Sequence, residues 1–376
     1  MLKINIALSF FLYSVCCFSQ SINIDTLPFN MAKKLLVFKG MLNGAIVDFA
    51  FDTDAGIGVL NAANQEVAKE KISYSRRKAI DANNRLVKGR EVDIKNVAIG
   101  SFVFKKVKSL YFDMEFLQCN QLYLLGQNVI SKLNWLFNFD NNTVQVSETP
   151  FKEDSSFTVI PVKGTNKRPY TELQIGGKKI YNCLIDFGYT GIIDFPETDF
   201  INEKYIDHQA SDNTSVGIYS GMGLGGLGKP DTLKSFKLDS VSIGTAGFND
   251  MMISVSEETD LKIGVGYFSK YCSAVILNHS TSSYFQKPRN KAVLLNKVFD
   301  ARISISDGKF IVTGKKNSPS TTASALEIGE EIKSVAGKAI SDFANTCDYF
   351  NWFNFTTQNE IIVEKLNGEK LMIIRG

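Results

Sequence analysis

Histidine is nearly absent from this 376-residue sequence, which contains only His208 and His279. Two isolated histidines offer little for a metal site, and no Gly-x-Ser-x-Gly segment is present to form a serine hydrolase elbow. Residues 75–78 fit Ser-x-x-Lys, a match expected by chance. Serine hydrolase chemistry is therefore poorly supported, and we expect both histidines to be ordinary surface or turn residues.

Cysteine is also scarce outside the N-terminus. Of the six cysteines, two lie within the first 18 residues, and the other four are far apart with no Cys-x-x-Cys pair. Metal and redox motifs are absent, so we expect no metal and no cofactor. The four could form disulfides in three connectivities or remain buried free thiols, and the sequence leaves both open. These residues are Cys119, Cys183, Cys272 and Cys347.

The chain has no large excess of charge and only one long apolar run. Its 42 basic residues are interspersed with 39 acidic ones, so we expect no strong field for nucleic acid. The apolar run covers residues 4–18 and follows Lys3, which predicts a secretory signal peptide over residues 1–19. Val15 stands where a lipidated cysteine needs a small residue, so we expect no lipid anchor. The protein should be exported, periplasmic or extracellular, and in contact with membrane only through that peptide.

An internal repeat organises the remaining chain, whose length suggests two or three folding units. In each half, a predicted hairpin with an Asn-Gly or Gly-Gly turn runs into an aspartate, Asp52 or Asp186. An Ile-Gly segment, a segment ending in glycine and two further strands follow in the same order both times. These elements are residues 35–38, 46–51, 99–104, 124–126, 135–139 and 143–146, matched by residues 173–175, 180–185, 243–248, 262–264, 274–277 and 283–285. Residues 147–156 and 286–291 read as connections.

Asp52 and Asp186 stand at equivalent positions of the repeat, each after a buried strand. Two facing carboxylates that share a proton can act on a peptide bond, one as the base on water and the other as the acid. Burial and mutual repulsion should separate their pKa values from the usual value of roughly 4. We therefore expect a catalytic pair, Asp52 and Asp186.

The chain resembles the retropepsin-like and pepsin-like aspartyl proteases of secreted bacterial proteins, which have two lobes and a C-terminal PDZ-like domain. The resemblance covers most of residues 28–376. The family's Asp-Thr-Gly-Ala/Ser turn is altered here, because Asp54 replaces its glycine in the first half and Phe187 replaces its threonine in the second. Asp54 should raise the proton affinity of the pair, and Thr53 should join the two turns alone. The expected active-site turn residues are Thr53, Asp54, Ala55, Phe187 and Gly188.

Two segments are candidates for flaps that close over a substrate. Residues 79–87 predict a hairpin with its tip at Asn83 and Asn84. Residues 217–228 are rich in glycine and fit Gly-x-Gly-x-x-Gly, but Pro230 argues against the helix that a nucleotide site would need. The expected flap and substrate-binding residues are Asp81, Ala82, Asn83, Asn84, Gly221, Gly223 and Gly225.

The last unit looks like a PDZ domain, on residues 318–320 and 325–338. Such domains bind extended peptides at a sheet edge. Glu330 and Ala336 replace the Asp and Asn of the pattern, which leaves a purely structural role equally open.

The sequence thus predicts a mainly β protein with two pseudo-symmetric aspartic-protease-like β-barrel lobes followed by a PDZ-like domain. The predicted boundaries are residues 1–19 for the signal peptide, 20–150 and 151–288 for the lobes, and 289–376 for the PDZ-like domain. The expected function is an aspartic-type endopeptidase acting as a monomer on peptide or protein. The alternatives are an inactive peptide-binding protein that uses the same cleft, and an unrelated β protein. Asp54→Gly combined with Phe187→Thr is expected to increase activity.

Overall fold

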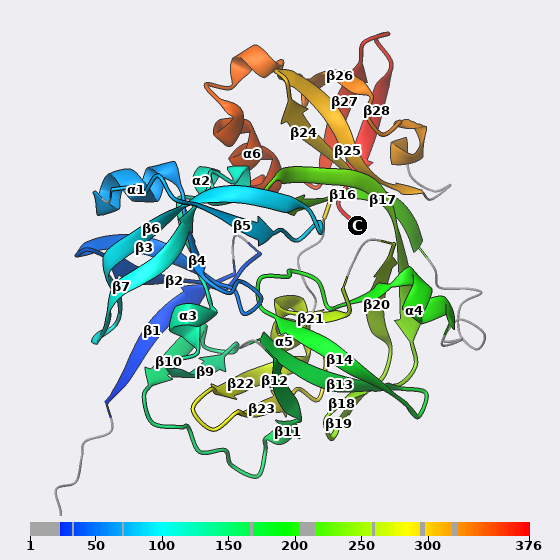
Figure 1. Cartoon of the computed structure of the whole chain (residues 1–376). Coiled ribbons are helices and arrows are strands. Elements are labelled where there is room, and N and C mark those ends of the chain that lie inside the picture. The colour runs from blue at the N-terminus through cyan, green and yellow to red at the C-terminus, as the bar shows by residue number, and fades with distance from the viewer. Residues whose placement is uncertain are drawn as a thin grey trace, which may run out of the picture.

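The computed structural model describes residues 23–31, 34–69, 71–165, 168–202, 215–257, 260–293, 298–317 and 322–376. The predicted signal peptide and His208 lie outside the described residues. The chain is mainly β, with 55% strand and 13% helix, as predicted. Figure 1 shows three groups of elements: the first lobe (residues 24–147, blue to green), the second lobe (residues 158–288, green to yellow) and the C-terminal unit (residues 298–376, orange to red). Within the described ranges, no helix has the length and apolarity needed to cross a membrane.

Six strands of the first lobe close into a barrel in the order β2-β3-β8-β4-β7-β6, because β6 pairs back onto β2. The hairpin β2–β3 turns at Asn43 and Gly44, whose φ angles of 52° and 88° suit the tight turn predicted there. The elements are β1 (Ile24–Asn30), β2 (Val37–Leu42), β3 (Ala45–Phe51), β4 (Gly58–Leu60), α1 (Ala62–Ala68), β5 (Arg76–Ile80), β6 (Leu86–Ile99), β7 (Phe102–Tyr111), α2 (Glu115–Cys119), β8 (Leu122–Leu125), α3 (Gln127–Ile130), β9 (Asn134–Asn138) and β10 (Thr143–Ser147).

The second lobe repeats these pairings. Strand β14 lies parallel to β21 as β3 does to β8, and β15 lies parallel to β20 as β4 does to β7. Its elements are β11 (Thr158–Ile160), β12 (Val162–Thr165), β13 (Arg168–Ile175), β14 (Lys178–Asp186), β15 (Ile193–Pro196), α4 (Glu197–Asn202), β16 (Ser215–Gly223), β17 (Gly226–Leu238), β18 (Val241–Ile243), β19 (Ala246–Phe248), β20 (Met251–Ser256), β21 (Lys262–Gly264), α5 (Val265–Tyr271), β22 (Cys272–Asn278) and β23 (Ser283–Pro288).

The two lobes share one antiparallel sheet and one core. Its strand order is β11-β23-β22-β9-β10-β1, and the lobes join at its centre, where Leu136 of β9 lies opposite Ile276 of β22. A single cluster of buried apolar residues runs from Phe29 in the first lobe to Tyr284 in the second. The shared sheet therefore fixes the position of one lobe against the other.

The connection predicted over residues 286–291 is wrong at its start. Strand β23 extends to Pro288, and Gln286 is fully buried within it. Its side chain accepts a hydrogen bond from the Tyr267 hydroxyl at 2.6 Å and donates to the carbonyl of Ile243 at 2.8 Å. These two partners let a polar side chain occupy a buried strand.

The C-terminal unit has its own core, formed by residues between Phe299 and Ile373. Its elements are β24 (Ala301–Ser306), β25 (Lys309–Asn317), β26 (Glu331–Val335), α6 (Thr346–Phe355), β27 (Glu360–Lys365), β28 (Lys370–Ile374) and the short 3-10 turns at Thr322–Ala325 and Ile340–Asp342.

This unit is joined to both lobes. Strand β25 pairs antiparallel with β16 of the second lobe, so the two units share a sheet, as Figure 1 shows. On the other side, a disulfide links Cys119 of α2 in the first lobe to Cys347 of α6. Cys183 and Cys272 are buried free thiols. One disulfide and two free thiols thus occur together, where the sequence had left both kinds open.

Candidate active site

Equivalent strands deliver the two aspartates. Asp52 follows the end of β3, and Asp186 is the last residue of β14. The turn after each aspartate is held to a following helix in the same way: the N–H of Gln127 donates to the carbonyl of Ala55 at 2.7 Å, and the N–H of Val265 to that of Tyr189 at 2.9 Å. The repeat read from the sequence therefore corresponds to matching backbone contacts around both turns.

The two turns meet closely between the lobes. A Cβ atom on Gly188 would lie 2.5 Å from the carboxyl carbon of Asp52, so only glycine allows this approach. One carboxyl oxygen of Asp52 accepts the N–H groups of Asp54 at 2.9 Å and Ala55 at 3.0 Å. One oxygen of Asp186 accepts the N–H of Gly188 at 2.8 Å. The structure thus brings both predicted aspartates and all five turn residues together.

Thr53 bridges the two active-site turns through its side-chain hydroxyl. Its hydroxyl donates to the carbonyl of Ile185 at 2.6 Å and accepts the N–H of Phe187 at 2.9 Å. The Thr53 side chain is fully buried, and Gln127 donates to its carbonyl at 3.0 Å. Because this buried hydroxyl both donates and accepts a hydrogen bond across the interface, it fixes the separation of the two turns.

Phe187 does not separate the two turns. Its ring is fully buried and stacks on Phe268 with the ring centres 4.8 Å apart. It also meets Phe51 edge to face, with the ring centres 5.6 Å apart, and stacks on Phe137 with the ring centres 5.5 Å apart. Phe187 therefore packs within an aromatic cluster at the position where the family has threonine. Its side chain has no polar atom, so its burial leaves no donor or acceptor unpaired.

Asp54 is paired with a cation from the other lobe. The Nε of Arg168, the first residue of β13, lies 2.9 Å from a carboxyl oxygen of Asp54 and donates to the Asp54 carbonyl at 3.2 Å. Nearby, the ammonium of Lys262 lies 4.9 Å from the centre of the Tyr189 ring. Sequence reasoning missed Arg168, because nothing local to residue 168 indicates a partner 114 residues earlier.

The environment raises both carboxyl pKa values. Burial is the main cause for Asp52, the charge of Asp54 adds to it, and the pKa rises to about 6. For Asp186, burial is again the main cause, followed by the charges of Asp52 and Asp54, and its pKa lies well above the usual value. Asp52 accepts two N–H groups from its turn and Asp186 accepts one, which favours ionisation of Asp52 first.

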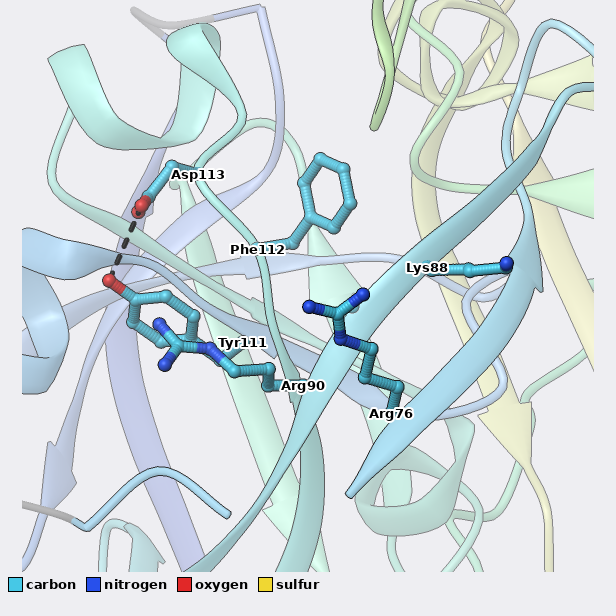
Figure 2. Close-up of a pocket in the computed structure, with 7 residues that line it drawn as sticks. Arg76, Lys88, Arg90, Tyr111, Phe112 and Asp113 are labelled. Carbon is cyan, nitrogen blue, oxygen red and sulfur yellow. Dashed lines mark hydrogen bonds between the residues drawn. The ribbon is translucent and has the colours of Figure 1, made fainter. Parts of the chain in front are cut away.

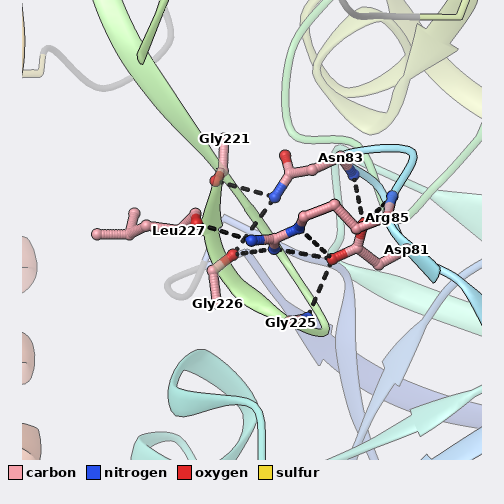
Figure 3. A network of polar contacts seen from close by, with 7 residues as sticks. All are labelled: Asp81, Asn83, Arg85, Gly221, Gly225, Gly226 and Leu227. Atoms are coloured by element: carbon pink, nitrogen blue, oxygen red, sulfur yellow. Dashed lines mark hydrogen bonds and ion pairs between the residues drawn. The ribbon is translucent and has the colours of Figure 1, made fainter. Parts of the chain in front are cut away.

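The two predicted flaps contact each other, as Figure 3 shows. Buried Asp81 accepts the Arg85 guanidinium at 2.8 Å and the N–H of Gly225 at 3.0 Å. Arg85 also donates to the carbonyls of Gly226 at 2.7 Å and Leu227 at 2.9 Å. We call this set of contacts between the hairpins β5–β6 and β16–β17 the flap clasp.

Other predicted flap residues lie within or beside the clasp. The Asn83 amide donates to the carbonyls of Gly221 and Gly226, both at 3.3 Å. Gly223 lies beside the Asp81 carboxylate, whereas Ala82 and Asn84 are exposed at the tip. Arg85 was missed, although Asp81 and Arg85 flank the predicted hairpin tip, where opposite charges on the two sides of a turn could have suggested a pair.

His279 lies in the turn after β22, as predicted, but it is not an open surface residue. Its ring packs edge to face with Tyr284, whose hydroxyl is 2.9 Å from Nδ1. Burial lowers the pKa of this histidine to about 4.

One comparison with known proteins bears on this site. Residues 38–129 match the family model described as aspartyl protease. That span includes Asp52 with its turn, the first flap and Gly126, and it does not include Asp186. No curated protein matches the chain. The match supports an aspartyl protease family for the first lobe of this chain.

Proposed function

We propose that the chain is an exported aspartic-type endopeptidase that uses Asp52 and Asp186 to hydrolyse peptide bonds. The observation that carries the proposal is the bridge made by Thr53, which holds equivalent aspartates against each other across the lobe interface. A catalytic pair needs such fixed geometry, because displacements near 1 Å can cost about a hundredfold in rate.

The asymmetry of the pair assigns the roles. Asp52, with the lower pKa, is the ionised base that takes a proton from water, while protonated Asp186 gives its proton to the substrate carbonyl oxygen. The water oxygen bonds to the carbonyl carbon and a neutral gem-diol forms. The C–N bond then breaks as the amine takes the proton from Asp52 and a gem-diol hydroxyl returns one to Asp186. Both aspartates end in their starting states.

The disulfide supports the exported part of the proposal. Disulfides persist in oxidising compartments and are rare in the cytosol. The Cys119–Cys347 link closes 228 residues of chain, and it fits the predicted signal peptide.

A second candidate is a peptide-binding protein that does not cleave. Two observations favour it: Phe187 leaves a single hydroxyl to bridge the turns, and hydrogen bonds hold the tips of the two flaps together. Under this proposal the cleft holds an extended peptide and the aspartates bind its backbone.

The test is cleavage of a denatured protein mixture by the mature chain between pH 4 and 9, with Asp52→Asn and Asp186→Asn as blanks. We expect new amino termini to appear with wild type only, and pepstatin to suppress them. Binding of a labelled peptide by all three proteins without cleavage would reject the peptidase and support the second candidate. Equal cleavage by wild type and blanks would assign the activity to a contaminant.

A further inference from the structure

The first flap carries like charges directly opposite each other. In the register of β5 and β6, Arg76 faces Arg90 and Lys78 faces Lys88. All four side chains are exposed and share one face of the hairpin. Like charges at facing positions destabilise a strand pair, so this face is not arranged for the stability of the hairpin alone.

The neighbouring acids are engaged elsewhere. Asp113 accepts the N–H of Ala62 at 2.7 Å and the Tyr111 hydroxyl at 3.3 Å. Glu91 pairs at 3.6 Å with Arg77, which points to the opposite face. Among the described residues, none of the four cations has a carboxylate within ion-pair distance.

A pocket opens beside this face, as Figure 2 shows. Its volume is about 420 Å³, and it is lined by Arg76, Lys88, Gly89, Arg90, Tyr111, Phe112 and Asp113. The guanidinium of Arg90 lies 4.9 Å from the centre of the Tyr111 ring, which holds that cation at the rim. Cations around two aromatic rings suit a ligand with both anionic and apolar groups.

The shape of the surface favours an extended chain. Strand β5 is the last strand of its sheet, and apart from β6 no described strand pairs with it. Cations on alternate residues of a strand stand about 6.8 Å apart, the same repeat as alternate side chains of an extended peptide. Toward the tip the same face continues with Ile80 and Leu86, which are 69% and 61% exposed.

We propose that the outward face of the first flap binds an acidic segment of a polypeptide in extended form, with glutamate or aspartate at alternate positions. This assignment rests on the proposed function in one respect: the bound segment would belong to the substrate and lie outside the cleaved stretch. The four cations would hold its carboxylates while the aromatic rings contact its apolar side chains.

The test is binding, measured by fluorescence anisotropy on the Asp52→Asn protein so that cleavage plays no part. The probe is a labelled peptide of about ten residues with glutamate and valine alternating, and its partner has glutamine at each glutamate. We expect the glutamate peptide to bind at least about tenfold more tightly at low salt, and to lose that advantage as salt rises.

The Arg76→Glu variant distinguishes a loss of peptide binding from a loss of folding stability. The new glutamate faces Arg90, so the thermal melting temperature should stay or rise while affinity for the acidic peptide falls about tenfold. Lys105→Glu, the same charge change on β7, should leave affinity unchanged. Equal binding of both peptides, or an Arg76→Glu protein that binds as well as its parent, would overturn the proposal. Binding only to anionic phospholipid vesicles would also overturn it. Peptide binding by a chain that cleaves nothing would retain this surface and reject the peptidase.

Discussion

Asp54 occupies the position where the second lobe has Gly188, and the structure shows how a carboxylate is tolerated there. The ion pair with Arg168 compensates part of its charge, and burial is the main reason that the pKa of Asp54 is itself raised. The site therefore contains three carboxyl groups whose proton affinities are all above normal. A catalytic aspartate pair carries one proton between its two carboxyls. The pH range in which Asp52 and Asp186 share one proton therefore also depends on the charge of Asp54.

We predict a pH optimum near neutral for cleavage. Activity should rise as Asp52 loses its proton around pH 6 and fall only when Asp186 ionises at a higher pH. The charge of Asp54 raises the pKa of both residues, so Asp54→Gly should move both limbs of the profile to lower pH. The measurement is kcat/KM against pH for wild type and variant. A wild-type optimum near pH 3 would contradict the assignment.

The packing of Phe187 bears on the expectation that Asp54→Gly combined with Phe187→Thr increases activity. Replacing it with threonine to restore a second bridging hydroxyl would empty part of the aromatic cluster that includes Phe268 and Phe51. Truncations of buried phenylalanine cost about 3 to 5 kcal/mol. A combined Asp54→Gly and Phe187→Thr protein would therefore lose stability, and the single substitution Asp54→Gly is the cleaner variant.

Thr53→Val tests the bridge between the lobes. Valine keeps the shape but leaves the Phe187 N–H and the Ile185 carbonyl buried without partners, so the free energy of unfolding should fall by about 1 to 3 kcal/mol. Urea denaturation measures this. Thr171→Val is the matched control, because the Thr171 hydroxyl is buried and has no hydrogen-bond partner among the described residues. Similar losses for both variants would show that the bridge adds nothing specific.

At the scale of elements, the flap clasp holds the tips of two hairpins together. Burial alone would raise the pKa of Asp81, but the hydrogen bonds from Arg85 and from backbone N–H groups outweigh it and lower the pKa. A carboxyl with a lowered pKa stabilises the folded form above its unfolded pKa of about 3.9 and loses that effect as pH falls through the folded value. The clasp should therefore persist at neutral pH and weaken only in strong acid.

Arg85→Ala should loosen the clasp without unfolding the lobes. It removes the donors to the carbonyls of Gly226 and Leu227, and charged hydrogen bonds of this kind contribute about 1.5 to 3 kcal/mol each. Hydrogen exchange at the tip of β16–β17 should quicken by about tenfold or more, while exchange in the shared sheet stays unchanged. Arg77→Ala, in the same hairpin but outside the clasp, is the control. Unchanged exchange at Gly225 in Arg85→Ala would mean that Arg85 does not hold the tips together.

Local patterns predicted the hairpins and the order of the repeat, because a tight turn and alternating side chains are properties of a few neighbouring residues. The hairpin around Gly176 and Gly177 is one such case, with φ angles of 54° and 84°. The pairing of β25 with β16 and the ion pair of Arg168 with Asp54 had no such signal. These contacts form between residues that are far apart in the sequence and depend on how the folded units pack together. The residues around each contact position therefore give no pattern that predicts it.

At the scale of the whole molecule, the disulfide and the β16–β25 pairing attach the C-terminal unit to both lobes. Substituting both Cys119 and Cys347 with serine should lower the free energy of unfolding by about 3 to 5 kcal/mol, because the cross-link restricts a long segment of the unfolded chain. Urea denaturation under oxidising conditions provides the comparison. A reducing agent should destabilise wild type by the same amount and leave the double variant unchanged. If it weakened both equally, the loss would have another cause.

The shared six-stranded sheet also bears on when the site can form. Strands β9 and β22 are separated in sequence by most of the second lobe, so their pairing has a high sequence separation and a large closure entropy. A chain that emerges from the ribosome N-terminus first contains Asp52 early and Asp186 later, and β22 follows only after Asp186. Until residues 272–278 are available, β9 is paired only with β10, and the lobe that contains Asp186 lacks the strand that joins it to the first lobe. Under the proposed function, the two aspartates are therefore held together only late in synthesis, after β22 has been made.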